Sequence, residues 1–516
     1  MTRRGVLHEA PVIILVMVAT IVPSAVLVAR GFSGGELMTI WRRPGVTDAV
    51  WFSLWQGLAS TALTFAVAAI PTWILSRCDF AGRRVVHALL TVPFVMPTVV
   101  VAAAFRSALP DSLDHSVIAV LLAHVFFNVA VVVRIVGPAL AAISSGQFEA
   151  ARTLGASWWH TFAHVTWPTI RRAVVASASL VMLMCSTSYG VVRILGPSGT
   201  DTVETEVYRR AMRLGDIDGA VVLALIQMAA IIAVIAIAGG LRRRRTVDAA
   251  VISVERQPAG IALMVMVCVT SALFIAPLAA MLMASVRTDG AWTLTGWRAL
   301  LGRSARVEGD HTGPGLDLGI DLWRALATSA AYALIAGAAA TAIALTSRAR
   351  RLSTLVATIP LAVSPVVVGL GILVTYDTHP FDFRSSWWLV PVVHASIATP
   401  FACRAVASRR SAIPPDLLAA ASTLGASPWR RFILVEVPVL RPALATTFAL
   451  SAAVSLGEFG ATSLLSRGDH PTLPLAISQL LLKAGDIPYS AAMATSTVLL
   501  ALTLLIVLTL DRSAHA

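Results

Sequence analysis

The chain carries twelve apolar segments long enough to cross a lipid bilayer, and these segments constrain its fold more than any other feature. A helix crosses the hydrocarbon core of a membrane with about 20 mostly apolar residues. The segments lie at about residues 11–29, 50–76, 86–106, 116–143, 171–190, 218–240, 259–285, 322–347, 352–375, 386–408, 441–465 and 488–510. Only 13% of the 516 residues are charged, whereas soluble domains carry about 25%. We therefore predict an all-α polytopic membrane protein with about 12 transmembrane helices.

The positions of the arginines predict the orientation of these helices. If the N-terminus lies in the cytoplasm, the even-numbered loops are cytoplasmic. Those loops contain Arg77, Arg83, Arg84, Arg152, Arg171, Arg172, Arg242 to Arg245, Arg348, Arg350, Arg351, Arg409, Arg410, Arg430 and Arg431. The outside loops also carry arginines, but their positive charge is offset by acidic residues: Asp201, Glu204, Glu206, Asp216 and Asp218. The positive-inside rule favours a multi-pass protein of the plasma or inner membrane with both termini in the cytoplasm.

The net charge and the N-terminal segment each have two possible interpretations. The net charge of +13 comes from arginines at the ends of apolar segments, so we expect no nucleic-acid partner. Segment 11–29, behind Arg3 and Arg4, resembles a signal peptide in composition. It has no small-x-small cleavage site at its end, and we expect it to be a retained first transmembrane helix.

Two polar stretches between apolar segments repeat each other at an offset of 270 residues. The first runs Glu149-Ala150-Ala151-Arg152-Thr153-Leu154-Gly155-Ala156-Ser157, and the second runs Ala419-Ala420-Ala421-Ser422-Thr423-Leu424-Gly425-Ala426-Ser427. Each continues to a phenylalanine, Phe162 or Phe432, and a proline, Pro168 or Pro438. An alanine run, a glycine and a serine in this order predict a helix, a turn and a second helix.

The same offset relates the two halves of the chain well beyond this motif. His124 matches His394, Tyr189 matches Phe459, and Gly215-Asp216 matches Gly485-Asp486. Pro93 and Pro97 resemble Pro360 and Pro365 with one residue inserted. The chain therefore contains a duplicated six-helix unit. Because six is even, both copies share one orientation, which predicts two parallel repeats: residues 1–241, a basic cytoplasmic linker at 242–258, and residues 259–516.

These repeated stretches resemble the EAA loops of permease subunits in binding-protein-dependent ABC importers. Twelve segments in one chain with two such loops resemble the fused permeases of the ferric iron and thiamine group, with the type I importer fold. The resemblance implies that loops at about 144–170 and 411–440 couple the permease to its ATPases. The implied coupling residues are Glu149, Ala150, Ala151, Gly155, Ala156, Phe162, Pro168, Ala419, Ala420, Gly425, Ala426, Trp429, Phe432 and Pro438.

The resemblance also implies the partners: two copies of a cytoplasmic ABC ATPase and an extracytoplasmic solute-binding protein. A phosphate-binding P-loop needs a lysine next to Ser or Thr, and the single lysine of this chain, Lys483, precedes Ala484. We therefore expect no cofactor on this chain, with ATP used by the partner, and no enzymatic activity of its own. One departure from the motif, Ala419 in place of glutamate, suggests that the two loops engage their ATPases unequally.

Four residues are candidates for a pathway or gate: Glu458, its counterpart Ser188, and Pro97 and Pro365 in predicted central helices. An ionisable group within a membrane span is energetically costly and usually faces a cavity or a partner. Glu458 could therefore line the transport pathway or form a hydrogen bond that packs helices together, and the sequence favours neither role over the other. The prolines could kink mobile helices or static ones. His124 and His394 are better explained as packing residues than as ligands, and we expect no metal site.

The substrate and the transport mechanism leave alternatives. Thiamine and ferric iron are the substrates that the resemblance favours, and the stretch Ser455 to Thr462 also resembles molybdate and sulfate permeases. A secondary transporter of the major-facilitator type also has six plus six helices. It would place its long loop between the halves, whereas here the long polar loops lie inside each half.

Overall fold

A computed structural model describes residues 9–33, 39–240, 257–258, 260–301, 319–347, 356–377, 383, 386–466 and 469–515. Several predicted features lie outside these ranges: Arg3 and Arg4, residues 242–256 of the linker, and Arg348, Arg350 and Arg351.

The first half is helical almost throughout. Its elements are α2 (Ala10–Val16), η1 (Met17–Ile21), α3 (Val22–Ser33), η2 (Ile40–Arg42), α4 (Val46–Arg77), β1 (Cys78–Asp79), α5 (Arg83–Thr91), η3 (Val92–Phe94), α6 (Thr98–Ala108), η4 (Asp111–Leu113), α7 (Val117–Ala141), α8 (Ser145–Thr153), α9 (Trp158–Thr161), η5 (Phe162–Thr166), α10 (Trp167–Ser186), α11 (Gly190–Leu195), α12 (Val203–Arg209), η6 (Arg210–Leu214) and α13 (Ile217–Gly240).

The second half repeats this order. Its elements are β2 (Gln257–Pro258), α14 (Ile261–Ala284), β3 (Arg287–Thr288), β4 (Ala291–Trp292), α15 (Thr295–Leu300), α16 (Leu322–Thr346), η7 (Ile359–Ala362), α18 (Pro365–Tyr376), α19 (Leu389–Ser411), α20 (Pro415–Thr423), α21 (Pro428–Arg431), η8 (Phe432–Glu436), α22 (Val437–Gly457), α23 (Gly460–Leu465), α24 (Leu473–Leu481) and α25 (Asp486–His515). Two short pairings, β1 with β2 in parallel and β3 with β4 in antiparallel orientation, are the strand contacts of the described residues.

The number of membrane spans agrees with the prediction. Within the described ranges, ten helices are long and apolar enough to cross a membrane, and two bent helix pairs bring the number to twelve if each pair is one span. The pairs are Arg83–Phe94 with Thr98–Ala108, bent by 107°, and Val356–Ala362 with Pro365–Tyr376, bent by 102°. A proline stands at each bend and cannot donate a backbone hydrogen bond.

The two bends correct one part of the predicted alignment of the halves. Pro93 and Pro360 both take the second position of a short 3₁₀ turn, as expected. Pro97, however, is the residue that caps the start of α6, where Ser364 caps α18, so Pro365 matches Thr98 rather than Pro97. No inserted residue is needed between the halves at this point.

The predicted spans at 171–190 and 441–465 are also corrected. The helices there run from Trp158 to Ser186 and from Pro428 to Gly457, so they begin earlier and end sooner than predicted. The apolar pattern continues into α11 and α23, but the backbone breaks before each of them. Hydropathy does not register such a break because the residues on both sides are apolar.

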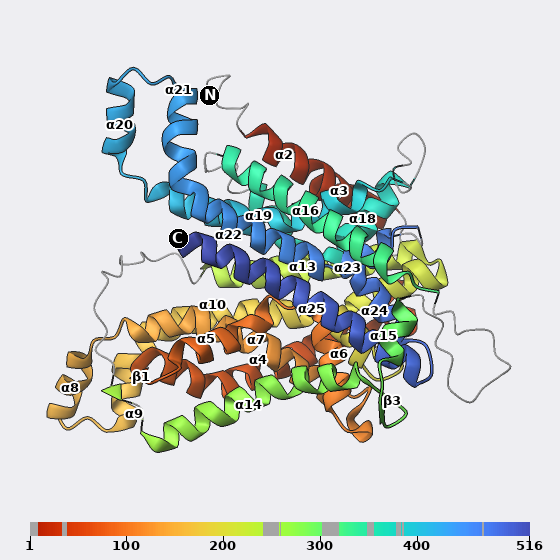
Figure 1. Cartoon of the computed structure of the whole chain (residues 1–516), viewed down its shortest axis with the longest axis horizontal. Helices are drawn as coiled ribbons and strands as arrows, with labels where there is room; N and C mark the ends of the chain where they lie inside the picture. The colour runs from red at the N-terminus through yellow and green to blue at the C-terminus, as the bar shows by residue number, and fades with distance from the viewer. Residues whose placement is uncertain are drawn as a thin grey trace.

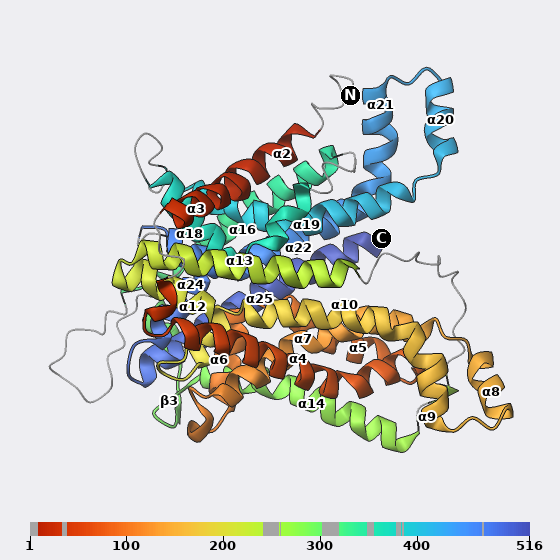
Figure 2. The same cartoon turned by 180° about the vertical axis from the view of Figure 1, so that it is seen from behind.

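The halves lie side by side and exchange their first helices (Figure 1). Helix α3 of the first half packs against α18 of the second, and α14 of the second half packs against α6, α5 and α4 of the first. Figure 2 shows α13 running along the boundary between the halves. One core of buried side chains includes residues of both halves, such as Val100 and Leu370. The two repeats therefore form one unit.

The outer helices present apolar side chains to their surroundings. On α14, the residues Ile261, Val265, Val269 and Leu273 recur at every fourth position and expose more than half of their surface. Such a stripe along one face of a helix suits contact with lipid tails rather than water.

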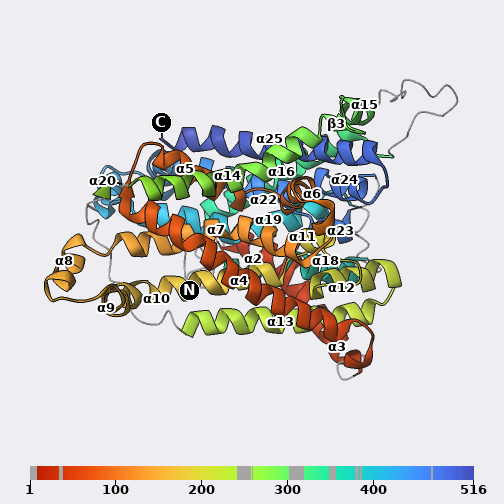
Figure 3. The ribbon, with the colours of Figure 1, turned by 90° about the horizontal axis from the view of Figure 1, so that it is seen from below.

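The helices run roughly parallel, so the molecule has two ends (Figure 3). Helices α8, α9, α20 and α21 lie at one end, which we call the motif end, and α2 begins and α25 ends there (Figure 1). The hairpin of β3 and β4 and helix α15 lie at the opposite end. The parallel arrangement of the repeats places both motifs together, as the even number of helices per half predicts.

Candidate functional site

The two repeated motifs adopt the same helix–turn–helix structure. Helix α8 is followed by Gly155 with φ +74°, and α20 is followed by Gly425 with φ +78°. This left-handed backbone conformation favours glycine because it has no Cβ atom. The amide of Ala156 donates to the Ala151 carbonyl over 3.0 Å, and the amide of Ala426 donates to that of Ala421 over the same distance.

A serine starts the second helix in each motif. The Ser157 hydroxyl accepts from the His160 amide, and the Ser427 hydroxyl accepts from the Arg430 amide, both over 3.3 Å. Serine is favoured at this position because its side chain satisfies an amide that has no partner within the helix. The Gly-Ala-Ser sequence of each copy therefore ends one helix and begins the next.

The tips of both motifs expose large apolar side chains at equivalent positions. Leu154 and Leu424 expose 86% and 87% of their surface, and Trp159 and Trp429 expose 69% and 67%. No residue of α8 or α20 is buried. Apolar groups grouped at an exposed tip are typical of a protein-binding surface.

Aromatic stacking and a widened helical turn support each tip. The rings of Trp158 and Phe162 lie 5.7 Å apart, as do those of Trp429 and Phe432. The π-helical turns η5 and η8 begin at Phe162 and Phe432. Pro168 and Pro438 stand at the second position of the helices that follow, and each lacks the amide that a regular helix needs there, which explains the local change in hydrogen bonding.

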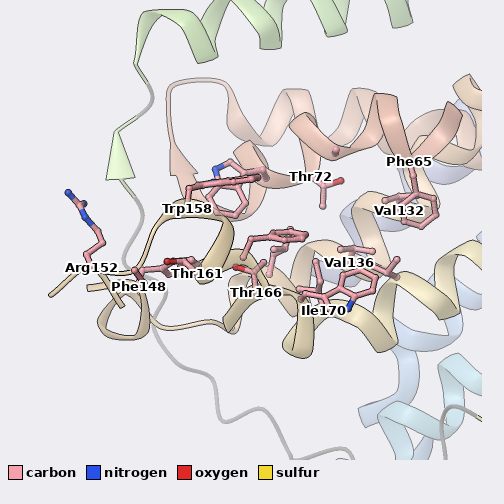
Figure 4. Close-up of a pocket in the computed structure, with 17 residues that line it drawn as sticks. Phe65, Thr72, Val132, Val136, Phe148, Arg152, Trp158, Thr161, Thr166 and Ile170 are labelled. Atoms are coloured by element: carbon pink, nitrogen blue, oxygen red, sulfur yellow. The ribbon is translucent and has the colours of Figure 1, made fainter. Parts of the chain in front are cut away.

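Behind the first motif lies an apolar cavity of about 910 Å³ that the sequence did not predict. Trp158 and Phe148 border it from the motif, and Phe65, Val132 and Ile170 border it from α4, α7 and α10 (Figure 4). At its edge, the guanidinium group of Arg77 lies 4.6 Å from the Phe148 ring centre. This cavity lies between the first motif and helices α4 and α7.

The predicted coupling residues thus fall into two matched groups at the motif end. The first contains Glu149, Ala150, Ala151, Gly155, Ala156, Phe162 and Pro168, and the second contains Ala419, Ala420, Gly425, Ala426, Trp429, Phe432 and Pro438. Glu149 is exposed on α8 and makes no ion pair with any described residue, and Ala419 takes its place on α20.

The four pathway candidates come together around a second cavity, of about 350 Å³, between the halves. We call it the central cavity; Pro97, Ser188, Pro365 and Glu458 all line it. Each stands at a helix break: before α6, before α11, at the start of α18 and before α23. The breaks of the two halves lie close together: a Cβ atom added to Gly457 would lie 3.2 Å from the Cα atom of Pro97.

Glu458 both lines the cavity and holds the start of α23. Its carboxylate accepts hydrogen bonds from the amides of Ala461 at 2.8 Å and Thr462 at 2.9 Å. The His394 Nε2 atom lies 3.2 Å from Oε2. Glu458 lies at the end of a helix rather than in the middle of one.

The paired histidines have both ring nitrogens hydrogen bonded, as the packing interpretation predicts. His124 contacts Ser60 at 3.0 Å and Ser188 at 2.8 Å. His394 contacts Ser455 at 2.7 Å and Thr462 at 2.9 Å. Each histidine therefore joins α7 or α19 to the residues at a helix break. Within the described ranges, no group of three or more His, Cys, Asp or Glu residues could hold a metal ion.

Two acids that the sequence placed in an external loop are buried instead. Glu204 is 1% exposed and lines the central cavity, and Glu206 is fully buried in the middle of α12. The Glu206 carboxylate binds Arg209 at 2.6 Å and Arg210 at 2.7 Å. The signal in the sequence is the segment 203–207, where the acids alternate with Val203 and Val207 next to a helix break.

Comparisons with known proteins identify the relatives of this chain. It is 25% identical over 480 residues to the thiamine transport system permease protein ThiP of Escherichia coli, covering 86% of this chain and 85% of that protein. It is 26% identical to ThiP of Brucella abortus, covering 83% of this chain and 81% of the relative. A putative 2-aminoethylphosphonate transport system permease protein, PhnV of Salmonella typhimurium, is 38% identical over 30% of this chain and 58% of its own length.

The family comparison matches both halves. The pattern described as "Binding-protein-dependent transport system inner membrane component" covers residues 61–247 and again residues 315–515. This result excludes the major-facilitator alternative and agrees with the multi-pass helical fold. The chain is a fused permease that belongs to the family of inner-membrane components of binding-protein-dependent transport systems, the permease subunits of ABC importers.

Proposed function

We infer that this chain imports thiamine, which a solute-binding protein delivers from outside and which passes through the central cavity. Two copies of an ABC ATPase, one on each motif, drive the transport. The observation that carries this proposal is the match of two exposed motif tips, Leu154 with Leu424 and Trp159 with Trp429, in a chain whose relatives named ThiP align over most of its length.

The motif tips suit two copies of one partner. Their exposed leucine and tryptophan side chains occur at equivalent positions and lie at the same end of the molecule. Aromatic and apolar side chains that fill a pocket of the partner commonly supply most of the binding energy. A partner that binds one tip can bind the other in the same way, which favours two identical ATPase subunits.

A continuous helix leads from each motif to the central cavity. The segment Trp158–Ser186 has 29 residues and ends beside Ser188, and Pro428–Gly457 has 30 residues and ends beside Glu458. At 1.5 Å per residue, each helix is about 45 Å long. In the proposed mechanism, ATP binding draws the two ATPases together, and these helices carry the motion to the breaks that border the cavity.

The orientation follows from the ATPases. ATP is found in the cytoplasm, so in the proposal the motif end, where α2 begins and α25 ends, is the cytoplasmic end. The binding protein then meets the end with β3, β4 and α15. This chain contributes no ATP site or other cofactor in the proposal; its partner hydrolyses ATP.

Thiamine is the substrate that the relatives favour over the alternatives from the sequence. Two relatives named as thiamine permeases align over more than 80% of this chain, whereas PhnV aligns over 30%. Ferric iron is the alternative substrate, because the sequence resemblance implies it together with thiamine.

The decisive experiment measures uptake of labelled thiamine, ferric iron and 2-aminoethylphosphonate in cells with and without this chain. We expect only thiamine uptake to fall when the chain is removed and to return when it is restored. Unchanged thiamine uptake would overturn the substrate, and a loss of iron or phosphonate uptake alone would replace it.

The coupling sites are tested separately by co-purification of the ATPase. Leu154→Asp combined with Leu424→Asp places charges on tips that make no buried contact, so the permease should fold normally. We expect ATPase retention to fall at least roughly tenfold, since a lost anchor residue often costs 2 kcal/mol or more. Leu294→Asp, an exposed leucine directly before α15 and outside both motifs, is the control. Full retention in the double variant would remove the motif tips as the binding site.

A further inference from the structure

Two buried acceptor atoms in the central cavity have no hydrogen-bond partner among the described residues. They are Oε2 of Glu204 and Oδ1 of Asn128, and both residues line the cavity. The other Glu204 oxygen accepts from Nε2 of Gln227 over 3.3 Å, and Ser364 offers its side chain to the same carboxyl group. The Asn128 amide nitrogen donates to the His124 carbonyl over 2.9 Å.

Glu204 differs in this respect from the other acids near it. Glu458 is satisfied by two backbone amides, and Glu206 is paired with Arg209 and Arg210. Glu204 makes no ion pair with any described residue. A buried carboxylate without a cation is costly, so such a group either holds a proton or binds a cation that comes from outside the protein.

The walls of the cavity suit a ring-shaped cation. Tyr189 and Phe459 lie 5.1 Å apart between ring centres, and Phe94 and Phe127 lie 5.9 Å apart; all four border the cavity. Aromatic faces attract cations and stack against other rings. A volume of about 350 Å³ lies at the lower end of the range of small-molecule sites.

The unpaired acceptors belong to one half only. The residues equivalent to Asn128 and Glu204 are Ala398 and Pro474. The second half therefore forms its helix breaks without these two acceptors. In contrast, both halves keep a histidine that is hydrogen bonded to a residue at a helix break. A purely structural need at the breaks would apply to both halves alike.

We propose that Glu204, Asn128 and the aromatic walls form a binding site inside the permease for an organic cation with an aromatic ring. The Glu204 carboxylate faces the positive charge, the Asn128 oxygen accepts a hydrogen bond from the solute, and the rings stack against it. This inference rests on the proposed thiamine function and deepens it: the thiazolium ring of thiamine has a fixed positive charge, and its aminopyrimidine ring has donors.

The test uses the complete transporter, permease with ATPase and binding protein, in liposomes. It compares uptake of thiamine with uptake of a neutral analogue in which a thiophene ring replaces the thiazolium ring. Glu204→Gln keeps the size of the side chain and removes its charge. We expect thiamine uptake at subsaturating solute to fall at least roughly tenfold, with uptake of the neutral analogue changed less than twofold. Glu204→Asp, which keeps the charge, should recover part of the thiamine uptake.

Three further measurements separate folding from recognition. Retention of the ATPase by the Glu204→Gln permease reports correct folding, and Asn128→Ala provides a second variant with the carboxylate intact and is expected to weaken uptake of both solutes. Asp218→Asn removes an exposed acid paired with Arg30 and should leave both uptake rates unchanged.

The outcomes distinguish the two proposals. Equal losses of thiamine and neutral analogue in Glu204→Gln would overturn the cation site, as would normal thiamine uptake in that variant. Absence of thiamine uptake by the unmodified transporter would instead overturn the proposed function, whatever the variants do.

Discussion

Tyr189 and Phe459 occupy equivalent positions in the two repeats, and their rings meet 5.1 Å apart at the central cavity. Each residue is the last one of a helix break, next to Ser188 in one half and next to Glu458 in the other. A Cβ atom on Gly190 would lie 3.3 Å from the Phe459 ring, so the two breaks are held close together. This contact joins the two halves at the central cavity, where residues of both halves line the proposed transport path.

The first prediction concerns this aromatic contact. Tyr189→Ala combined with Phe459→Ala removes the pair that closes the space between the two breaks. We expect passive leakage of small solutes through the permease in liposomes without ATP, measured as release of a trapped dye or ion. Stability should change little beyond the burial lost, since an aromatic pair contributes about 0.5–1.5 kcal/mol.

Tyr376→Ala is the matched control for leakage, because this tyrosine lies at the end of α18 and its hydroxyl donates to the Val18 carbonyl at 2.9 Å. Tight liposomes with the double variant, equal to those with the control, would show that the two rings do not close the path.

The second prediction addresses the two readings of Glu458. Because its carboxylate satisfies the amides of Ala461 and Thr462, Glu458→Ala leaves two buried donors unpaired. We expect a loss of about 1–3 kcal/mol in stability, seen as a lower unfolding temperature of the purified permease. Glu458→Gln should lose less, since its amide oxygen still accepts a hydrogen bond.

Transport by these variants decides between the readings. We expect uptake per folded molecule to stay near that of the unmodified chain in Glu458→Gln, which would favour the helix-packing role. Asp218→Asn, which removes an exposed acid that lies 2.7 Å from Arg30, serves as control. A stable Glu458→Gln permease without uptake would support the pathway role instead.

The third prediction follows from an ion-pair network at the end opposite the motifs. Asp216 lies 2.6 Å from Arg43 and 2.7 Å from Arg210. Partial burial alone would raise the pKa of Asp216, but hydrogen bonds from Arg43, the Gly219 amide and Arg210 outweigh it and lower the pKa to about 2. The charged form is therefore favoured in the folded protein.

A carboxyl group with a lowered folded-state pKa stabilises the protein above its unfolded pKa of 3.8 and loses this effect as the pH falls toward about 2. At pH 7 we expect Asp216→Asn to be less stable by about 1 kcal/mol, allowing for solvent screening. The difference in unfolding temperature from the unmodified chain should shrink between pH 4 and pH 2. Asp218→Asn should change stability by less than about 0.5 kcal/mol throughout; a constant difference for Asp216→Asn would contradict the ionic explanation.

The local structure of the motifs could be predicted because their chemistry is local. Gly155 and Gly425 need a left-handed conformation, and Ser157 and Ser427 start the next helix, so a few adjacent residues determine the turn. The repeat offset then placed both motifs at one end without any knowledge of packing.

The central cavity could be predicted only in part. Ser188 and Glu458 were recognised as a pair, but the apolar sequence on both sides of them hid the helix breaks. The burial of Glu204 depends on contacts with Gln227 and Ser364, which are distant in the sequence. A charged residue in a short segment between apolar spans looks like a loop residue unless the segment is known to turn inward.

The last prediction concerns Glu149, which stands at one of the two motif positions where the halves differ in charge; the other pairs Arg152 with Ser422. Glu149 is exposed on α8 and makes no ion pair with any described residue, so its carboxylate is available to a basic group of the ATPase; Ala419 offers none. An exposed ion pair contributes about 0.2–1 kcal/mol, so we expect Glu149→Ala to weaken ATPase binding by roughly two- to fivefold.

Because salt screens exposed charges, the difference should nearly vanish at high salt. Titration of the purified permease with the ATPase at low and high salt measures both effects, and Asp111→Ala, in the turn η4 outside both motifs, controls for the loss of one negative charge. Ala419→Glu should leave binding at least as strong as in the unmodified chain. Equal binding by Glu149→Ala and the unmodified permease at low salt would show that the two motifs engage their ATPases without help from this carboxylate.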